Sequence, residues 1–121
     1  MRLTQKQLNL WLAKWQAMLR LQDWDITAEL QDRKEMDGAD GLCGPTAARR
    51  HAVIYIAKNA GCPKNIVPHD PERTLVHELL HVLFSPFELQ ESESPSGIAQ
   101  EQVVDQMATL LLRLERATKL Q

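Results

Sequence analysis

The stretch DPERTLVHELLHVLF, residues 70–84, decides how this chain folds. Asp70 is placed to cap a helix N-terminus, and Pro71 suits the first helical position. Ser85 precedes Pro86, and a residue before proline is pushed out of the helical conformation. Between these signals the apolar residues lie almost all round the helix, which is typical of a buried helix. The sequence therefore predicts a buried helix that ends near Phe84.

This predicted helix carries the pattern HExxH, as His77, Glu78 and His81. Residues four apart share one face of a helix, so the two imidazoles can bind one ion. Zinc accepts neutral histidine nitrogens, and a catalytic zinc has three protein ligands and an open position for water. Glu78 is placed to take a proton from that water as general base. The alternative is a pair of core histidines bonded to carbonyls, but metal binding better satisfies so many buried polar groups.

A third zinc ligand is expected downstream, where the chain has no histidine or cysteine after His81. The remaining donors are carboxylates: Glu88, Glu91, Glu93, Glu101 and Asp105. The first three fall in a predicted loop rich in Ser, Pro and Glu, residues 85–96. Glu101 and Asp105 instead share a core-tending face of a second predicted helix, from about Pro95 or Ser96 to Ala117. We predict Glu101 as the third ligand and Asp105 as the acceptor of a ligand histidine's second ring N–H.

HExxH followed by ExxxD on the next helix resembles the gluzincin metallopeptidases. The small size and the phrase TLVHELLHVL are similar to the compact ImmA/IrrE-type and minigluzincin domains of bacteria and phages. In those domains a helix of the pattern E-x-x-A-[ND]-x-[FM]-A supplies the third ligand. Residues 101–108 resemble it, except that Val104 replaces the alanine. The resemblance covers residues 50–112 and implies a zinc metallopeptidase. SprT-like proteins fit less well, because they are expected to have a later histidine ligand.

Length and composition indicate a single domain over residues 1–121. The net charge of −2 argues against nucleic acid or an anionic membrane as the main partner, since both need a basic face. Lys6, Lys14 and Arg20 interrupt the apolar residues of the N-terminal stretch, so neither a signal peptide nor a membrane span is expected. We therefore expect a cytoplasmic protein that acts on a peptide or protein substrate.

The chain before residue 70 predicts a helix, two strands and two connections. Thr4 can cap an amphipathic helix of about five turns that reaches Leu21. Alternating apolar residues predict strands over 24–30 and 52–57, and polar, glycine-containing stretches predict a loop or loose hairpin connection over 31–46 and a connection over 59–69. The order indicates an α+β fold of minimal zincin-like type: an N-terminal helix, a small sheet, the HExxH helix and a ligand-bearing C-terminal helix. In zincins the sheet edge near the active helix binds an extended peptide, so the resemblance implies this use for residues 52–57 if that strand is an edge.

Two groups of residues leave alternatives open. Hydrolysis of an amide needs a donor to the developing oxyanion besides zinc, and the candidates are Tyr55, His51 and His69. Cys43 and Cys62 are expected as reduced thiols, with a disulfide and a Cys43–zinc bond that holds the enzyme latent as alternatives.

The sequence thus predicts a zinc-dependent peptidase with ligands His77, His81 and Glu101 and the general base Glu78. The competing interpretation is a non-catalytic zinc-containing interaction module, such as a regulatory protein of a phage or mobile element. An intact Glu78 favours the enzyme, because a structural zinc site has no use for a carboxylate there. The lack of an obvious specificity subdomain favours the module.

Overall fold

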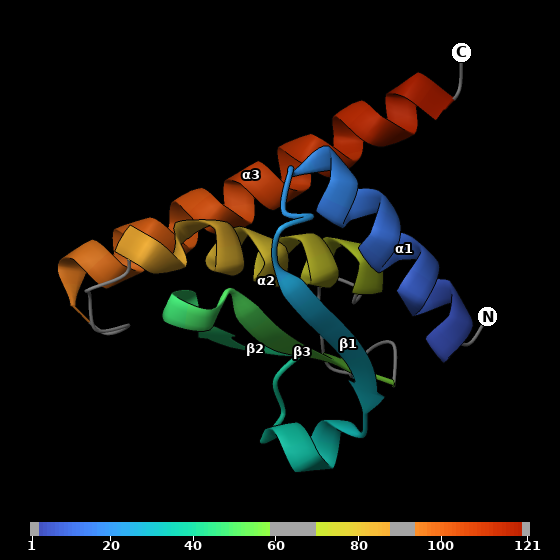
Figure 1. Cartoon of the computed structure of the whole chain (residues 1–121), viewed down its shortest axis with the longest axis horizontal. Helices are drawn as coiled ribbons and strands as arrows, with labels where there is room; N and C mark the ends of the chain where they lie inside the picture. Colours follow the sequence, from blue (N-terminus) through green and yellow to red (C-terminus); the bar gives the residue numbers. More distant parts are fainter. Residues whose placement is uncertain (1–2, 59–69, 88–93, 120–121) are drawn as a thin grey trace.

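The computed structural model describes residues 3–58, 70–87 and 94–119, and it has the α+β architecture that the sequence predicts (Figure 1). The helices and strands, in chain order, are α1 (Gln5–Met18), β1 (Asp25–Gln31), β2 (Gly41–Thr46), β3 (His51–Ala57), α2 (Pro71–Phe84) and α3 (Pro95–Lys119). Three short 3-10 helices join them: η1 (Arg33–Met36), η2 (Ala47–Arg49) and η3 (Ser85–Phe87).

Over the described residues the sheet has three strands in the order β1-β3-β2, with β1 parallel and β2 antiparallel to β3. The sequence predicts a loop or loose hairpin connection over 31–46, but Gly41–Thr46 form strand β2. The local pattern did not indicate this strand, because strands usually avoid glycine and proline. Pairing with β3 on one side is enough to hold such a strand at an edge, where proline is tolerated. The strand over 52–57 is therefore the central strand and not an edge, and the edges are β1 and β2.

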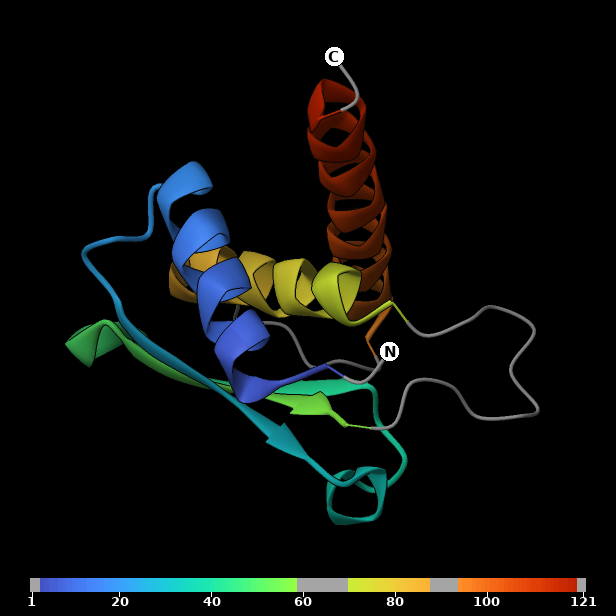
Figure 2. The same cartoon turned by 90° about the vertical axis from the view of Figure 1, so that its right-hand side faces the viewer.

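Helices α1 and α2 lie on the same face of the sheet, and α2 lies between the sheet and α3 (Figures 1 and 2). The core fills the space that these elements enclose. It takes residues from each of the three α-helices and from β1 and β3, including Leu8, Trp15, Ile54, Ile56, Leu75, Leu79, Leu80, Val104 and Ala108. Helix α2 contributes the most buried residues of any element, as its nearly continuous apolar sequence predicts.

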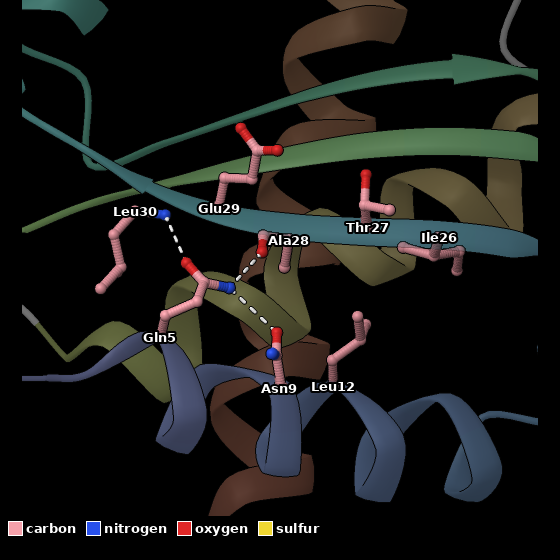
Figure 3. Close-up of a pocket in the computed structure, with 8 residues that line it drawn as sticks. All are labelled: Gln5, Asn9, Leu12, Ile26, Thr27, Ala28, Glu29 and Leu30. Carbon is pink, nitrogen blue, oxygen red and sulfur yellow. Dashed lines mark hydrogen bonds between the residues drawn. The ribbon is translucent and has the colours of Figure 1, made fainter.

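Helix α1 begins as predicted and ends earlier than predicted. The side chain of Thr4 accepts a hydrogen bond from the N–H of Gln7, which caps the helix. The chain leaves the helix after Met18, and Arg20 adopts a left-handed conformation with φ of 59°. The first residue, Gln5, also binds the open edge of β1: its amide donates to the carbonyl of Ala28 at 2.7 Å and accepts from the N–H of Leu30 at 3.3 Å (Figure 3).

Helices α2 and α3 follow their predicted limits closely. Asp70 caps α2 by accepting from the N–H of Arg73, and Pro71 is the first helical residue. The α-helix ends at Phe84, but Pro86 does not push Ser85 out of the helical conformation as predicted: Ser85 has φ of −54° and ψ of −35°, and the chain continues as η3. Helix α3 starts at Pro95 and continues to Lys119, two residues beyond the predicted end. Within the described residues, no helix has the length and apolar character needed to cross a membrane.

A cluster of charged side chains joins α1, the first turn of α2 and the last turns of α3. Glu72, whose side chain is 8% exposed, accepts from Lys14 Nζ at 2.7 Å and from the indole N–H of Trp15 at 2.8 Å. Arg116 bonds Asp70 at 3.0 Å, and Glu115 accepts from Lys14 at 3.1 Å and from Lys119 at 3.0 Å. We call these residues the ion-pair cluster: Lys14, Trp15, Asp70, Glu72, Glu115, Arg116 and Lys119.

The ionised forms of this cluster are favoured in spite of their burial. Desolvation alone would raise the pKa of Glu72, but the hydrogen bonds from Lys14 and Trp15 outweigh it and the pKa lies below its ordinary value. The pKa of Asp70 is lowered in the same way, because Arg116 and the N–H of Arg73 offset desolvation. The pKa of Lys14 is raised, since its two carboxylate partners outweigh the opposing effect of burial. Ion pairs of this cluster therefore hold the C-terminal end of α3 against the first turn of α2.

Candidate metal centre

Helix α2 carries both histidines of the motif close together, and His77 lines a cavity at the surface. His77 and His81 are one turn apart, their ring centroids are 5.0 Å apart, and their side chains are 17% and 21% exposed. Glu78 is buried beside them. One ligand atom from each of His77, Glu78 and His81 can be chosen so that all three lie within 4.8 Å of one another. The HExxH pattern is therefore folded into a compact group of donors, as the helix geometry requires.

Helix α3 brings the two predicted carboxylates to these histidines. Glu101 places one oxygen 2.7 Å from Nε2 of His77 and the other 3.0 Å from Nε2 of His81. Asp105, one turn later, has Oδ1 at 3.4 Å from Nδ1 of His77. The two helices thus meet in the arrangement expected of a third ligand and of a partner for the second ring nitrogen. Glu88, Glu91 and Glu93, the other carboxylates considered, lie outside the described residues.

These donors fit a zinc ion. In a tetrahedral site with zinc–nitrogen and zinc–oxygen bonds of 2.0–2.2 Å, neighbouring ligand atoms lie about 3.3–3.5 Å apart. The two contacts of Glu101 are shorter than that by less than an ångström, so a small rotation of the half-exposed Glu101 side chain would open the space. Two neutral imidazoles and one carboxylate also form a common ligand set of catalytic zinc sites.

Strand β2 forms the opposite wall of the cavity. The cavity has a volume of about 260 Å³, and its lining includes Asp40, Gly41, Thr74 and Glu78. A Cβ atom added at Gly41 would lie 2.5 Å from Cγ2 of Thr74 and 3.3 Å from Cγ of Glu78. The strand backbone can therefore approach the helix only because residue 41 has no side chain. As a result, Glu78 lies on the β2 side of the centre, whereas Glu101 reaches it from α3.

Arg73 contacts the predicted partner residue Asp105, although the sequence reasoning did not single out this arginine. It lies one helical turn before His77, lines the same cavity, and places Nη1 2.5 Å from Oδ1 of Asp105. The helical spacing to His77 is visible in the sequence, but the pairing with Asp105 joins residues 32 positions apart. We call Arg73, His77, Glu78, His81, Glu101 and Asp105 the metal cluster.

Other residues singled out from the sequence are not brought to this centre. Tyr55 and His51 lie on β3, whose alternate residues Ala52, Ile54 and Ile56 face the core, so their side chains lie on the face of the sheet that α2 does not cover. Tyr55 therefore does not face the cavity as an oxyanion donor must. Cys43 lies on β2, partly buried against the core.

His69, the other proposed oxyanion donor, and Cys62 lie outside the described residues.

Comparisons of the chain with protein-family models, curated proteins and solved structures find no match. The resemblance to gluzincins accordingly stays a prediction that depends on the motif residues and their geometry.

Proposed function

We propose that this protein is a zinc-dependent peptidase. The observation that supports it best is the carboxylate of Glu101, which contacts Nε2 of both histidines of the HExxH helix from a different helix. Glu78 lies beside them as a further carboxylate that the ligand set does not need. A structural zinc site is closed by four protein ligands, whereas three ligands and a neighbouring base are the arrangement of a hydrolase.

Each residue of the centre then has a chemical role. A zinc ion bound here would lower the pKa of a water molecule and polarise the carbonyl of the scissile bond. His77, His81 and Glu101 would hold the metal, and Asp105, beside Nδ1 of His77, would accept the Nδ1–H and leave the lone pair of Nε2 free to bind the ion. Glu78 takes the proton of the attacking water and returns it to the leaving amine.

In this proposal, strand β2 is the part of the sheet that holds the substrate. It is the edge strand that borders the cavity, and one side of its backbone pairs with β3 while the other is open within the described part of the chain. An extended peptide can add to such an edge by main-chain hydrogen bonds. The substrate-binding role that the resemblance implied for residues 52–57 is therefore reassigned to Gly41–Thr46 in this proposal.

Metal content and the variant Glu78→Gln together test the proposal. The purified protein should contain close to one zinc per chain, and Glu78→Gln should keep that zinc and the fold while it loses hydrolysis of a degenerate fluorogenic peptide library. No uptake of added zinc would refute the metal site. Zinc binding with no cleavage by the unsubstituted protein would favour the interaction module, and full activity of Glu78→Gln would show that Glu78 is not the base.

A further inference from the structure

Within the metal cluster, Arg73 and Asp105 form an ion pair beside the His77 ring. The Nε2 atom of His77 faces Glu101 at 2.7 Å, and the Nδ1 atom on the other side of the ring faces Asp105. Arg73 lies on the same helix as His77, four residues earlier, and bonds the same oxygen of Asp105 that faces Nδ1. A continuous chain of contacts therefore runs from Arg73 through Asp105 and His77 to Glu101.

The two contacts of Asp105 differ in strength. Its oxygen is 2.5 Å from Nη1 of Arg73, closer than the 2.7–2.9 Å usual between charged groups, but 3.4 Å from Nδ1 of His77, beyond the usual 2.7–3.2 Å. The Asp105 side chain is 54% exposed, so packing alone does not fix its rotamer. Its position beside His77 is set mainly by the arginine, whose side chain is less exposed at 31%.

We propose that Arg73 is a positioning residue of the metal centre. It holds the carboxylate of Asp105 at Nδ1 of His77 and so keeps the imidazole turned with Nε2 toward the metal. This inference depends on the proposed zinc site, and it adds a residue that neither the HExxH nor the ExxxD pattern contains. The partners of ligand histidines commonly change metal affinity when they are lost, and a residue that fixes such a partner acts through it.

If Arg73 had only a structural role, a different result would be expected. If the Arg73–Asp105 pair only joins α2 to α3, its loss should resemble the loss of Arg116, which also joins these helices through Asp70 and Glu72. Arg73→Met and Arg116→Met form a matched pair, because methionine keeps much of the apolar stem and removes the charge. Thermal unfolding of both variants reports the structural contribution, and zinc affinity reports the positioning one.

The experiment measures zinc affinity by competition with a chromophoric chelator in the parent, Arg73→Met, Asp105→Ala, the double variant and Arg116→Met. We expect Arg73→Met to weaken zinc binding about 10-fold, toward the lower end of the range for partners of ligand histidines. The double variant should bind zinc as weakly as Asp105→Ala and no weaker, because both changes remove one interaction. Arg116→Met should keep the parent affinity.

A spectroscopic readout accompanies the titration. In the zinc-loaded parent the Nδ1 proton of His77 should be protected from exchange and visible in a ¹⁵N-correlated spectrum of the imidazoles. It should disappear in Arg73→Met and Asp105→Ala and remain in Arg116→Met. A folded Arg73→Met variant with parent affinity and a protected Nδ1 proton overturns the inference, as do additive losses in the double variant. A parent protein that binds no zinc refutes the proposed function instead.

Discussion

Two polar clusters join α2 to α3, and they differ in how their charges balance. The ion-pair cluster sets three cations, Lys14, Arg116 and Lys119, against three carboxylates, Asp70, Glu72 and Glu115. In the metal cluster, three carboxylates and two imidazoles gather around a single arginine of the described residues. The first cluster is complete as a set of ion pairs. The second has an excess of negative charge and nitrogen donors, which a divalent cation would balance.

We expect the two clusters to have separate roles, and experiments can test that separation. If the metal cluster binds zinc and the ion-pair cluster stabilises the fold, a substitution in one should leave the property of the other unchanged. The two properties are zinc affinity of the folded protein and the free energy of unfolding measured with a metal chelator present. The first two predictions below each change one of these properties and use the other as a control.

The largest effect is expected for Glu101→Ala. Removal of a ligand should weaken zinc binding by more than about 100-fold, beyond the 10- to 100-fold range found for partners of ligands. The free energy of unfolding without metal should change little, because the Glu101 side chain is 54% exposed. A competition titration measures the affinity, and Glu88→Ala, Glu91→Ala and Glu93→Ala serve as controls. Parent affinity in Glu101→Ala, with a large loss in one of the controls, would contradict the gluzincin arrangement.

Glu72→Ala should produce the opposite pattern. It removes the acceptor of Lys14 and of the indole N–H of Trp15, and the buried indole then lacks its partner. We expect a loss of about 2–3 kcal/mol in the free energy of unfolding, at or below the lower end of the range for broken buried pairs because Lys14 and Arg116 can reach water. Denaturant unfolding measures it, and Glu29→Ala on the exposed face of β1 is the control. A large change in zinc affinity without loss of stability would show that the clusters are not separate.

The third prediction concerns strand β2, where Gly41 lies against Thr74 and against Glu78 of the metal cluster. Gly41→Ala forces a Cβ against Thr74 and Glu78, so we expect a loss of about 1–3 kcal/mol from overpacking together with reduced peptide hydrolysis. Gly44→Ala on the same strand meets no atom within 4 Å and should stay within about 0.5 kcal/mol of the parent. Equal behaviour of the two variants would mean that the close approach of β2 does not position Glu78.

The sequence predicted the parts of this molecule that depend on local signals. Asp70 and Pro71 set the start of α2, and the four-residue spacings of α2 and α3 placed Glu101 and Asp105 opposite the histidines. These elements could be inferred because capping and helical periodicity act within a few residues.

The parts that were missed depend on contacts between distant residues. Strand β2 has glycine and proline where strands prefer branched residues, and only its pairing with β3 makes it a strand. The central position of β3 depends on strand order, which no local pattern encodes. The bonds from Arg73 to Asp105 and from Lys14 to Glu72 join residues 32 and 58 positions apart, where many pairings of opposite charges are equally compatible with the sequence.

The smallest expected effect is the pH dependence of stability without metal, and it tests the charge balance of the ion-pair cluster. The pKa values of Asp70 and Glu72 are lowered in the folded protein, so these groups stabilise it above the ordinary carboxyl pKa, about 4, and lose that contribution as the pH falls through their folded pKa values. Lys14, whose pKa is raised, contributes below its ordinary pKa and loses its contribution as the pH rises beyond it. Denaturant unfolding between pH 3 and pH 7 with a chelator present should show stability falling toward low pH, with a shallower slope in Glu72→Gln than in the parent. Equal slopes in Glu72→Gln and in the parent would mean that the charge of Glu72 does not stabilise the folded protein. The contrast between the balanced ion-pair cluster and the metal cluster, which needs a cation, would then have no physical basis.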